Sequence, residues 1–144
     1  MKFKLNNKEI ELTEEEVQEI VKQNSKPKGV EIKRWDNGEV IFASTKQTMK
    51  EAVEEAVNEG VSLSYANLFD TNLPNTNLSR VNLHNADLRN ADLYNAHLQN
   101  ANLYNAKLYH ADLHNANFYG KGGTQKLTKE QVPDFLKALG FIIE

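Results

Sequence analysis

The chain has 144 residues, of which 40% are hydrophobic and 26% are charged, a composition typical of a folded domain rather than a disordered one. It has no apolar run long enough to cross a membrane and no cysteine, which excludes disulfides, thiolate metal sites and a cysteine nucleophile. The formal net charge of −3 is too small to specify a partner. Met1–Lys4 lack an apolar signal core, so we expect a cytoplasmic protein without a membrane partner.

Residues 1–26 are predicted to form a small hairpin–helix unit. Two short strand-like runs, 3–5 and 9–12, flank a pair of asparagines that favours a turn. Thr13 and Glu16 have the spacing of a capping box, which predicts a short helix after the hairpin. We expect the apolar side chains of this helix to point inward.

Residues 27–60 are predicted to form a second β-hairpin followed by a helix that caps the next segment. The runs Val30–Trp35 and Glu39–Ala43 flank Asp-Asn-Gly, which is a strong hairpin signal. Residues 48–59 have an apolar stripe at helical spacing and a capping box at their start. We expect Trp35 to pack under this helix.

Residues 61–120 divide into twelve consecutive blocks of five residues. The third residue of each block is Leu in eleven blocks and Phe118 in the last, and the residue two places earlier is Ala in eight blocks. A helix face repeats about every 3.6 residues and a strand face about every 2, so neither explains a period of five. We therefore predict a solenoid that turns after every block, with a small residue and a Leu pointing inward.

Blocks such as Ala86–Asn90 (ADLRN) and Ala91–Asn95 (ADLYN) resemble the A(D/N)LXX pattern of the pentapeptide-repeat proteins. The resemblance implies a right-handed four-sided β-helix of about three coils. The expected fold class is thus mainly β, with the small α/β N-terminal region and a C-terminal helix as caps. Departures from the pattern predict a less regular backbone at 71–76. Residues 35–40 and the helix after them also resemble the leader of some phage-type members.

Residues 121–144 are predicted to form a C-terminal helix between Thr128 and Leu139, broken or restarted at Pro133. The segment is too apolar for an exposed tail, so we expect it to cap the last coil or to join two chains in a homodimer. The side chains assigned to this contact are Phe135, Leu136, Leu139, Phe141 and Ile142.

Four sides would place equivalent positions of successive coils twenty residues apart, so outward side chains are expected to form columns. Asn95 would then lie above Asn75 in an amide ladder that is structural rather than ligand-binding. Asp87 would lie under Lys107 as an ordinary exposed pair, worth roughly 0–1 kcal/mol.

The titratable side chains do not predict a catalytic or metal site. The histidines fall on different faces, and only His110 and His114 are expected to approach each other. Asp92 and Asp112 stack as a pair of carboxylates, which we expect to be solvated. Neither pair supplies the three or four converging ligands of a metal site. We therefore expect no enzyme activity, metal or cofactor.

Exposed aromatic side chains form the candidate interaction surface. Arg89 falls between Phe69 and Tyr109 in one column, which suits cation–π stacking. Several aromatic residues on a rigid surface suit a protein contact, although simple stacking of ordinary exposed strand residues is the alternative. The residues assigned to this surface are Phe69, Arg89, Tyr94, Tyr104, Tyr109 and Tyr119.

A solenoid without a nucleophile system or a phosphate loop predicts a non-catalytic structural or protein-interaction scaffold. The alternative comes from the resemblance, because some pentapeptide-repeat proteins mimic DNA and modulate type II topoisomerases. Such mimicry needs a dense negative surface, whereas residues 61–120 contain four acidic residues against three basic ones. Direct nucleic-acid binding is not expected either, because the repeat lacks a basic stripe.

Overall fold

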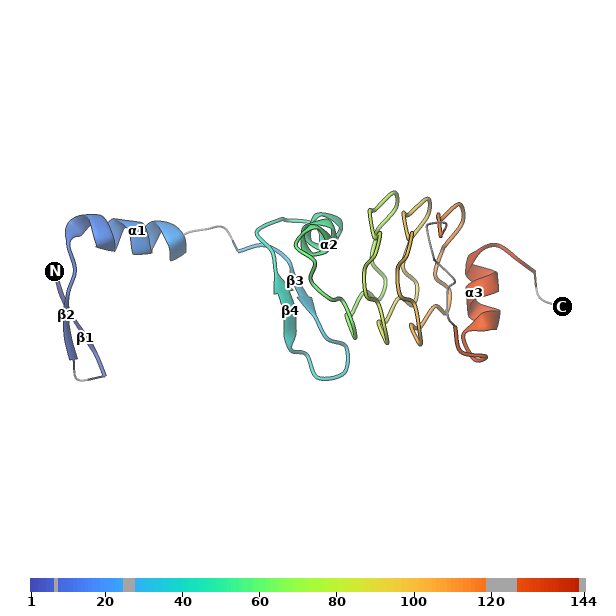
Figure 1. Cartoon of the computed structure of the whole chain (residues 1–144), viewed down its shortest axis with the longest axis horizontal. Helices are drawn as coiled ribbons and strands as arrows, with labels where there is room; N and C mark the ends of the chain where they lie inside the picture. The colour runs from blue at the N-terminus through green and yellow to red at the C-terminus, as the bar shows by residue number, and fades with distance from the viewer. Residues whose placement is uncertain (7, 25–27, 119–126, 143–144) are drawn as a thin grey trace.

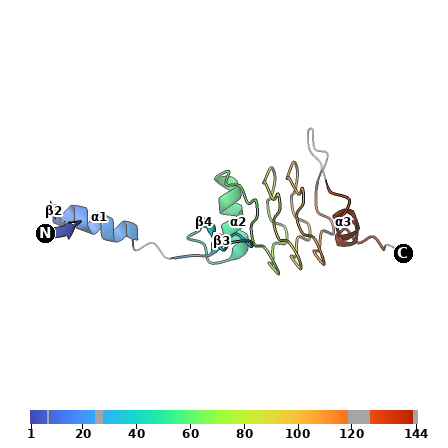
Figure 2. The same ribbon diagram turned by 90° about the horizontal axis from the view of Figure 1, so that it is seen from below.

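The computed structural model of the chain describes residues 1–6, 8–24, 28–118 and 127–142. In both views the elements follow one another along one long axis, from the N-terminal hairpin to the C-terminal helix (Figures 1 and 2). Within these described ranges, no helix is both long and apolar enough to cross a membrane.

The first unit is a hairpin and a helix without a core of its own. Strand β1 (Lys2–Leu5) pairs antiparallel with β2 (Lys8–Glu11), and α1 (Glu14–Asn24) follows. The predicted capping box is present, since the Glu16 backbone N–H donates to Thr13 Oγ1 at 3.2 Å and the Thr13 N–H donates to Glu16 Oε2 at 2.8 Å. The expectation of an inward apolar face is wrong, however, because no residue of α1 is buried.

The second unit caps the first coil of the repeat. Strands β3 (Glu31–Lys33) and β4 (Val40–Ala43) form an antiparallel hairpin, and α2 (Met49–Asn58) follows. The Thr48 side chain caps α2 by accepting a hydrogen bond from the Glu51 backbone N–H. The buried face of α2, with Ala52 among its residues, belongs to the same apolar cluster as the leucines of the repeat.

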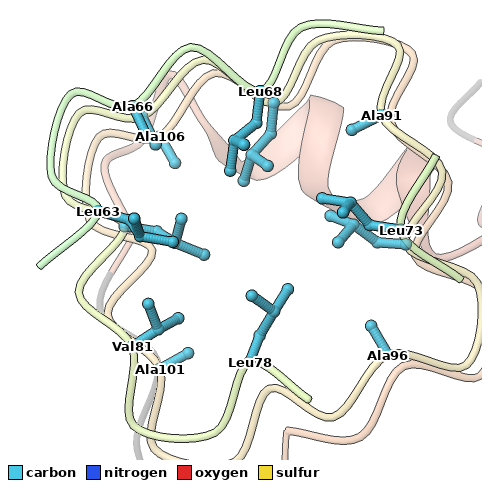
Figure 3. Packing of buried hydrophobic residues seen from close by; sticks show 14 of the residues in the cluster. Leu63, Ala66, Leu68, Leu73, Leu78, Val81, Ala91, Ala96, Ala101 and Ala106 are labelled. Atoms are coloured by element: carbon cyan, nitrogen blue, oxygen red, sulfur yellow. The ribbon is translucent and has the colours of Figure 1, made fainter. Parts of the chain in front are cut away.

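The repeat is a β-helix held together by parallel backbone bridges between residues twenty positions apart, such as Asn67–Asp87 and Asp87–Lys107. The central leucines of its blocks point into the middle of the coil and stack on those of the neighbouring coil (Figure 3). All eleven central leucines are at most 2% exposed, and the buried alanines two positions before them are at most 5% exposed. The five-residue period therefore reflects the filling of one continuous apolar core.

The first eleven blocks each end in a residue with left-handed backbone, from Tyr65 (φ 62°) to Asn115 (φ 56°) in steps of five. Asn is the non-glycine residue that tolerates this conformation best, which explains why it is so frequent at these positions. The irregular backbone predicted at 71–76 is wrong. Asn75 has φ 57° like its equivalents, and Asn72 forms the regular bridge to Asp92.

The last element, α3 (Val132–Ala138), lies against the final coil. The prediction that the helix begins at Thr128 is wrong, whereas the alternative of a helix that restarts at Pro133 agrees with the start of α3 at Val132. Thr128 instead begins a turn, closed by a hydrogen bond from the Gln131 backbone N–H to its carbonyl, and Pro133 lies in the first turn of α3. The Leu113 backbone N–H donates to the Ala138 carbonyl at 2.7 Å, which attaches α3 to the coil.

Candidate functional site

Several aromatic side chains lie in two neighbouring columns of the β-helix that Trp35 joins, and we call these two columns with Trp35 the aromatic wall. Tyr65, His84 and Tyr104 form a continuous stack along it, with ring centroids 6.2 and 5.6 Å apart. Tyr65 in turn contacts the ring of Trp35 at 6.3 Å. The aromatic wall consists of Trp35, Tyr65, Phe69, His84, Tyr104 and Tyr109.

Trp35 joins the β3–β4 hairpin to this wall. Its indole Nε1–H donates to the Asn85 carbonyl at 2.7 Å, and the Lys107 ammonium lies 3.4 Å from its ring centroid. The side chain is still 38% exposed. The prediction that Trp35 packs under the capping helix is therefore wrong, because its N–H and its ring are both engaged by the repeat.

Asp87 and Arg89 form a partly buried ion pair in the middle of the wall. The Asp87 residue is only 2% exposed, and its carboxylate accepts from Arg89 Nε at 2.8 Å and from Arg89 Nη2 at 2.6 Å. Burial raises the pKa of Asp87, but the hydrogen bonds and charge of Arg89, together with the charge of Lys107, lower that pKa below its ordinary value. The expected exposed pair of Asp87 with Lys107 is thus replaced by a pair with Arg89.

Two separate hollows share Arg89 as a lining residue, and together we call them the groove. The first hollow, of about 380 Å³, is lined by Trp35, Asn67, Phe69, Asp87 and Arg89. The second hollow, of about 260 Å³, lies between the repeat and the segment leading into α3. Its lining residues are Arg89, Asn105, Ala106, Lys107, Leu108, Tyr109, Thr128, Glu130, Gln131 and Asp134. The groove therefore runs from the hairpin to the C-terminal cap.

The proposed column of rings around Arg89 forms only in part. The Arg89 guanidinium carbon lies 5.4 Å from the Phe69 ring centroid. Tyr109, on the other side, stacks on His110 with the ring centroids 3.9 Å apart. Tyr94 lies in a different column, where its hydroxyl accepts a hydrogen bond from Asn115, and Tyr119 lies outside the described residues.

The predicted amide ladder is present but does not run through every coil. Asn95 Nδ2 donates to Asn75 Oδ1 at 2.6 Å, and Asn105 makes the equivalent bond to Asn85. Asn115 does not extend the first ladder, because its amide donates to the Tyr94 hydroxyl. These amides therefore form hydrogen bonds to other side chains of the repeat, either to another Asn or to Tyr94.

The remaining histidines and carboxylates pair locally. His114 Nδ1 lies 2.5 Å from Asp112 Oδ1, and the approach of His114 to His110 stays a prediction. Burial raises the pKa of Asp112, but the hydrogen bonds that His114 donates lower it below its ordinary value. In the part of the chain that the structure describes, no cluster of three or more such side chains could hold a metal ion.

Comparison with known proteins addresses the repeat itself. The family model described as pentapeptide repeats matches residues 62–100 and 86–120, with eight copies. Residues 62–120 are pentapeptide repeats. The crystal structure of a pentapeptide repeat protein (Rfr23) from the cyanobacterium Cyanothece 51142 is 38% identical over 44% of this chain, with a TM-score of 0.39. The match spans 40% of that protein, and none of the curated proteins compared matches the chain. The predicted pentapeptide repeat is confirmed over residues 62–120, while the likeness to phage-type leaders stays a prediction.

The C-terminal side chains divide into two groups around the end of the pentapeptide repeat. The Phe135 ring contacts the Phe118 ring at 5.4 Å, Leu139 packs against the apolar cluster, and Leu136 is half-buried. In contrast, Phe141 is 60% exposed and Ile142 is 90% exposed. The first group lies against the last coil, and the second projects away from it.

Gln131 was missed in the sequence, although it terminates the pentapeptide repeat. Its buried Nε2 donates to the carbonyls of Leu103 and Ala106 at 2.8 Å each, and its Oε1 accepts from the Asn105 backbone N–H at 2.8 Å. The Ala106 carbonyl and the Asn105 N–H are backbone groups that another coil would otherwise pair, as Lys107 and Tyr104 pair with Ala86 and Asn85 one coil earlier. A Gln shortly before a predicted helix gives no sequence signal for this role.

Proposed function

We propose that the protein is a non-catalytic scaffold that presents the aromatic wall to a protein partner. The observation that carries the proposal is the gathering of exposed rings on this wall, among them Phe69 at 47%, Tyr104 at 43% and Tyr109 at 54% exposure. Aromatic side chains and Arg are enriched in protein interfaces, because they bury much area with few rotatable bonds.

The backbone under the wall supports this role. We infer that the twelve blocks form about three coils of a right-handed four-sided β-helix, since bridges join residues twenty apart and successive leucines point inward around the coil. A surface on such a coil keeps its side chains in fixed columns. Binding therefore requires little ordering of the scaffold, which reduces the entropic cost of association.

The alternative, a DNA mimic that modulates a type II topoisomerase, is less well supported. A mimic needs exposed carboxylates at the positions of phosphates. On the aromatic wall, Asp87 is buried and paired, while Lys107 and the partly exposed Arg89 bring positive charge to the surface. A supercoiling assay with purified type II topoisomerase tests this alternative, and inhibition at low micromolar protein would favour it over the scaffold.

The experiment that tests the scaffold is an affinity capture from the native lysate with three baits. The baits are the wild-type chain, Tyr104→Ser on the aromatic wall, and Tyr94→Ser in a different column. Tyr94 and Tyr104 are similarly exposed, at 44% and 43%, so the two substitutions remove comparable surface. We expect a protein retained by the wild type and by Tyr94→Ser but lost with Tyr104→Ser. Identical captures by all three baits, or turnover of a substrate by the purified protein, would contradict the proposal.

A homodimer through the C-terminal segment is a separate proposal. Phe141 and Ile142 are the exposed apolar side chains that favour it. Sedimentation equilibrium of the full chain and of Phe141→Ser/Ile142→Ser tests it, with a dimer expected for the wild type and a monomer for the double variant. A wild-type monomer would refute it.

A further inference from the structure

We propose that the groove along the aromatic wall binds an extended peptide segment of the partner. In this peptide an apolar, an acidic and a basic side chain follow one another at alternate positions, in the direction from the β3–β4 hairpin to α3. The inference rests on the proposed scaffold function and specifies the chemistry of its ligand.

The hairpin end of the groove offers two aromatic rings to an apolar side chain, beside the polar Asn67 and the Asp87–Arg89 pair. The rings of Trp35 and Phe69 line the first hollow and are 38% and 47% exposed. The volume of this hollow, about 380 Å³, lies in the range of pockets that hold a compact ligand group. Trp35 is fixed by its hydrogen bond to the Asn85 carbonyl, so the hollow exists before a ligand arrives.

The middle of the groove offers hydrogen-bond donors and positive charge. Among the described residues, Asp87 accounts for two of the five N–H donors of Arg89, and the Arg89 side chain is 44% exposed. The Asp87 carboxylate is itself buried against Arg89, so it does not offer acceptors to a ligand. The backbone of Lys107 lies on the neighbouring coil, and its ammonium lies over the Trp35 ring, so it brings positive charge to the hairpin side of Arg89. A carboxylate is the group that complements a partly engaged guanidinium and an ammonium.

The opposite end of the groove is acidic. Glu130 and Asp134 line the second hollow together with the 54% exposed Tyr109. Among the ion pairs of the described residues, none engages Glu130 or Asp134. Their charge therefore complements a Lys or Arg side chain of the ligand, whose stem can lie along the Tyr109 ring.

The order of these three features sets the order of side chains in the peptide. Arg89 lines both hollows, so it separates the apolar end from the acidic end. Neighbouring coils are about 4.8 Å apart, and an extended peptide places side chains on one face about every 6.7 Å. Two residues is the shortest same-face spacing of such a peptide, and it exceeds the coil spacing by about 2 Å, which long acidic and basic side chains can span by leaning along the groove. A polyanion such as nucleic acid fits poorly, because its charge would meet Glu130 and Asp134.

The test uses a display library of random heptapeptides selected on the full chain. We expect enrichment of sequences with an apolar residue, then Asp or Glu two positions later, then Lys or Arg two positions after that. A synthetic peptide of the enriched sequence is then titrated while the fluorescence of Trp35, the one tryptophan of the chain, is recorded. Binding in the groove is expected to change this fluorescence.

Two variants and a matched control distinguish the groove from other surfaces. Phe69→Ser is expected to weaken binding of the peptide at least tenfold, and Tyr94→Ser, at a similarly exposed ring in another column, to change it less than twofold. In Glu130→Lys/Asp134→Lys, selection is expected to replace the third, basic position by an acidic one. Circular dichroism and thermal unfolding show whether each variant is folded.

The outcomes separate this inference from the scaffold proposal. If the library yields no such order, or if Phe69→Ser and Tyr94→Ser bind the peptide equally, the groove inference fails. If a partner is still captured by the wild type and lost with Tyr104→Ser, the scaffold proposal survives that failure. The inference would also be overturned if the wild type and Glu130→Lys/Asp134→Lys selected the same residue type at the third position of the peptide.

Discussion

Replacing Asn100 by Val tests the claim that the backbone, not side-chain bonding, requires Asn at the turns of the repeat. Asn100 is exposed and has φ 58°, in the left-handed region. For an L-residue this region costs roughly 1–2 kcal/mol, with Asn at the low end and β-branched residues at the high end. We expect Asn100→Val to lower the free energy of unfolding by about 1–2 kcal/mol, whereas Asn100→Gly should change it by less than about 0.5 kcal/mol.

The assay is urea unfolding followed by far-ultraviolet circular dichroism and by Trp35 fluorescence. Asn72→Val is the matched control, because Asn72 is also exposed but lies in a backbone bridge to Asp92, where a β-branched residue is suited to the strand. We expect Asn72→Val to be neutral or slightly stabilising. The reasoning is refuted if the two Val substitutions have equal effects, or if Asn100→Gly is as costly as Asn100→Val.

Four further substitutions test other parts of the fold. Thr76→Val is expected to raise the free energy of unfolding by about 1–3 kcal/mol, because Thr76 Oγ1 is buried without a hydrogen-bond partner among the described residues. Thr71→Val should lower the free energy of unfolding by about 1 kcal/mol in the same urea assay, because the substitution removes the 2.7 Å hydrogen bond that the Thr71 hydroxyl donates to the Leu68 carbonyl. Asp87 has a lower pKa in the folded chain than in the unfolded one, so its stabilising effect is present above about pH 4 and declines as the pH falls towards the folded pKa. Asp87→Asn should therefore flatten the loss of stability below about pH 4. Gln131→Ala should lower the free energy of unfolding by about 1–3 kcal/mol and speed amide hydrogen exchange in α3.

Each of these expectations has a result that contradicts it. The two Thr substitutions must have opposite signs, so a shared sign would show that the hydroxyls are not the deciding groups. A pH profile of Asp87→Asn parallel to that of the wild type would mean that this carboxylate does not control acid unfolding. Unchanged exchange in α3 after Gln131→Ala would show that the amide does not attach the C-terminal cap.

The core and the period of the repeat were predictable because they depend on volume alone. With a Leu at every fifth residue and an Ala two positions before it, both side chains must point into the coil to fill its interior. The left-handed turns could also have been predicted, since Asn recurs at the last position of the blocks, where the structure has positive φ. The predicted ladders of side-chain amides explain only some of these Asn residues, such as Asn75 and Asn95, which hydrogen-bond to each other.

The groove depended on contacts that the sequence pattern does not encode. The twenty-residue spacing places His84 beneath Tyr104, so this part of the stack could have been derived by counting. The position of Trp35 could not, because it follows from the docking of a hairpin that lies fifty positions from its hydrogen-bond partner Asn85. The burial of Asp87 depends on the same docking, since Trp35 and Asp87 line one hollow.

The pairing of residue 87 with residues 67 and 107 also limits how such a chain can change in length. An insertion of one five-residue block would move every later side chain into the adjacent column and separate Arg89 from Tyr109. An insertion of twenty residues would restore every column and lengthen the molecule by about 4.8 Å. Surfaces of this kind can therefore be extended only by whole turns, so duplications and deletions that are not multiples of twenty residues would reassign which side chains meet the ligand.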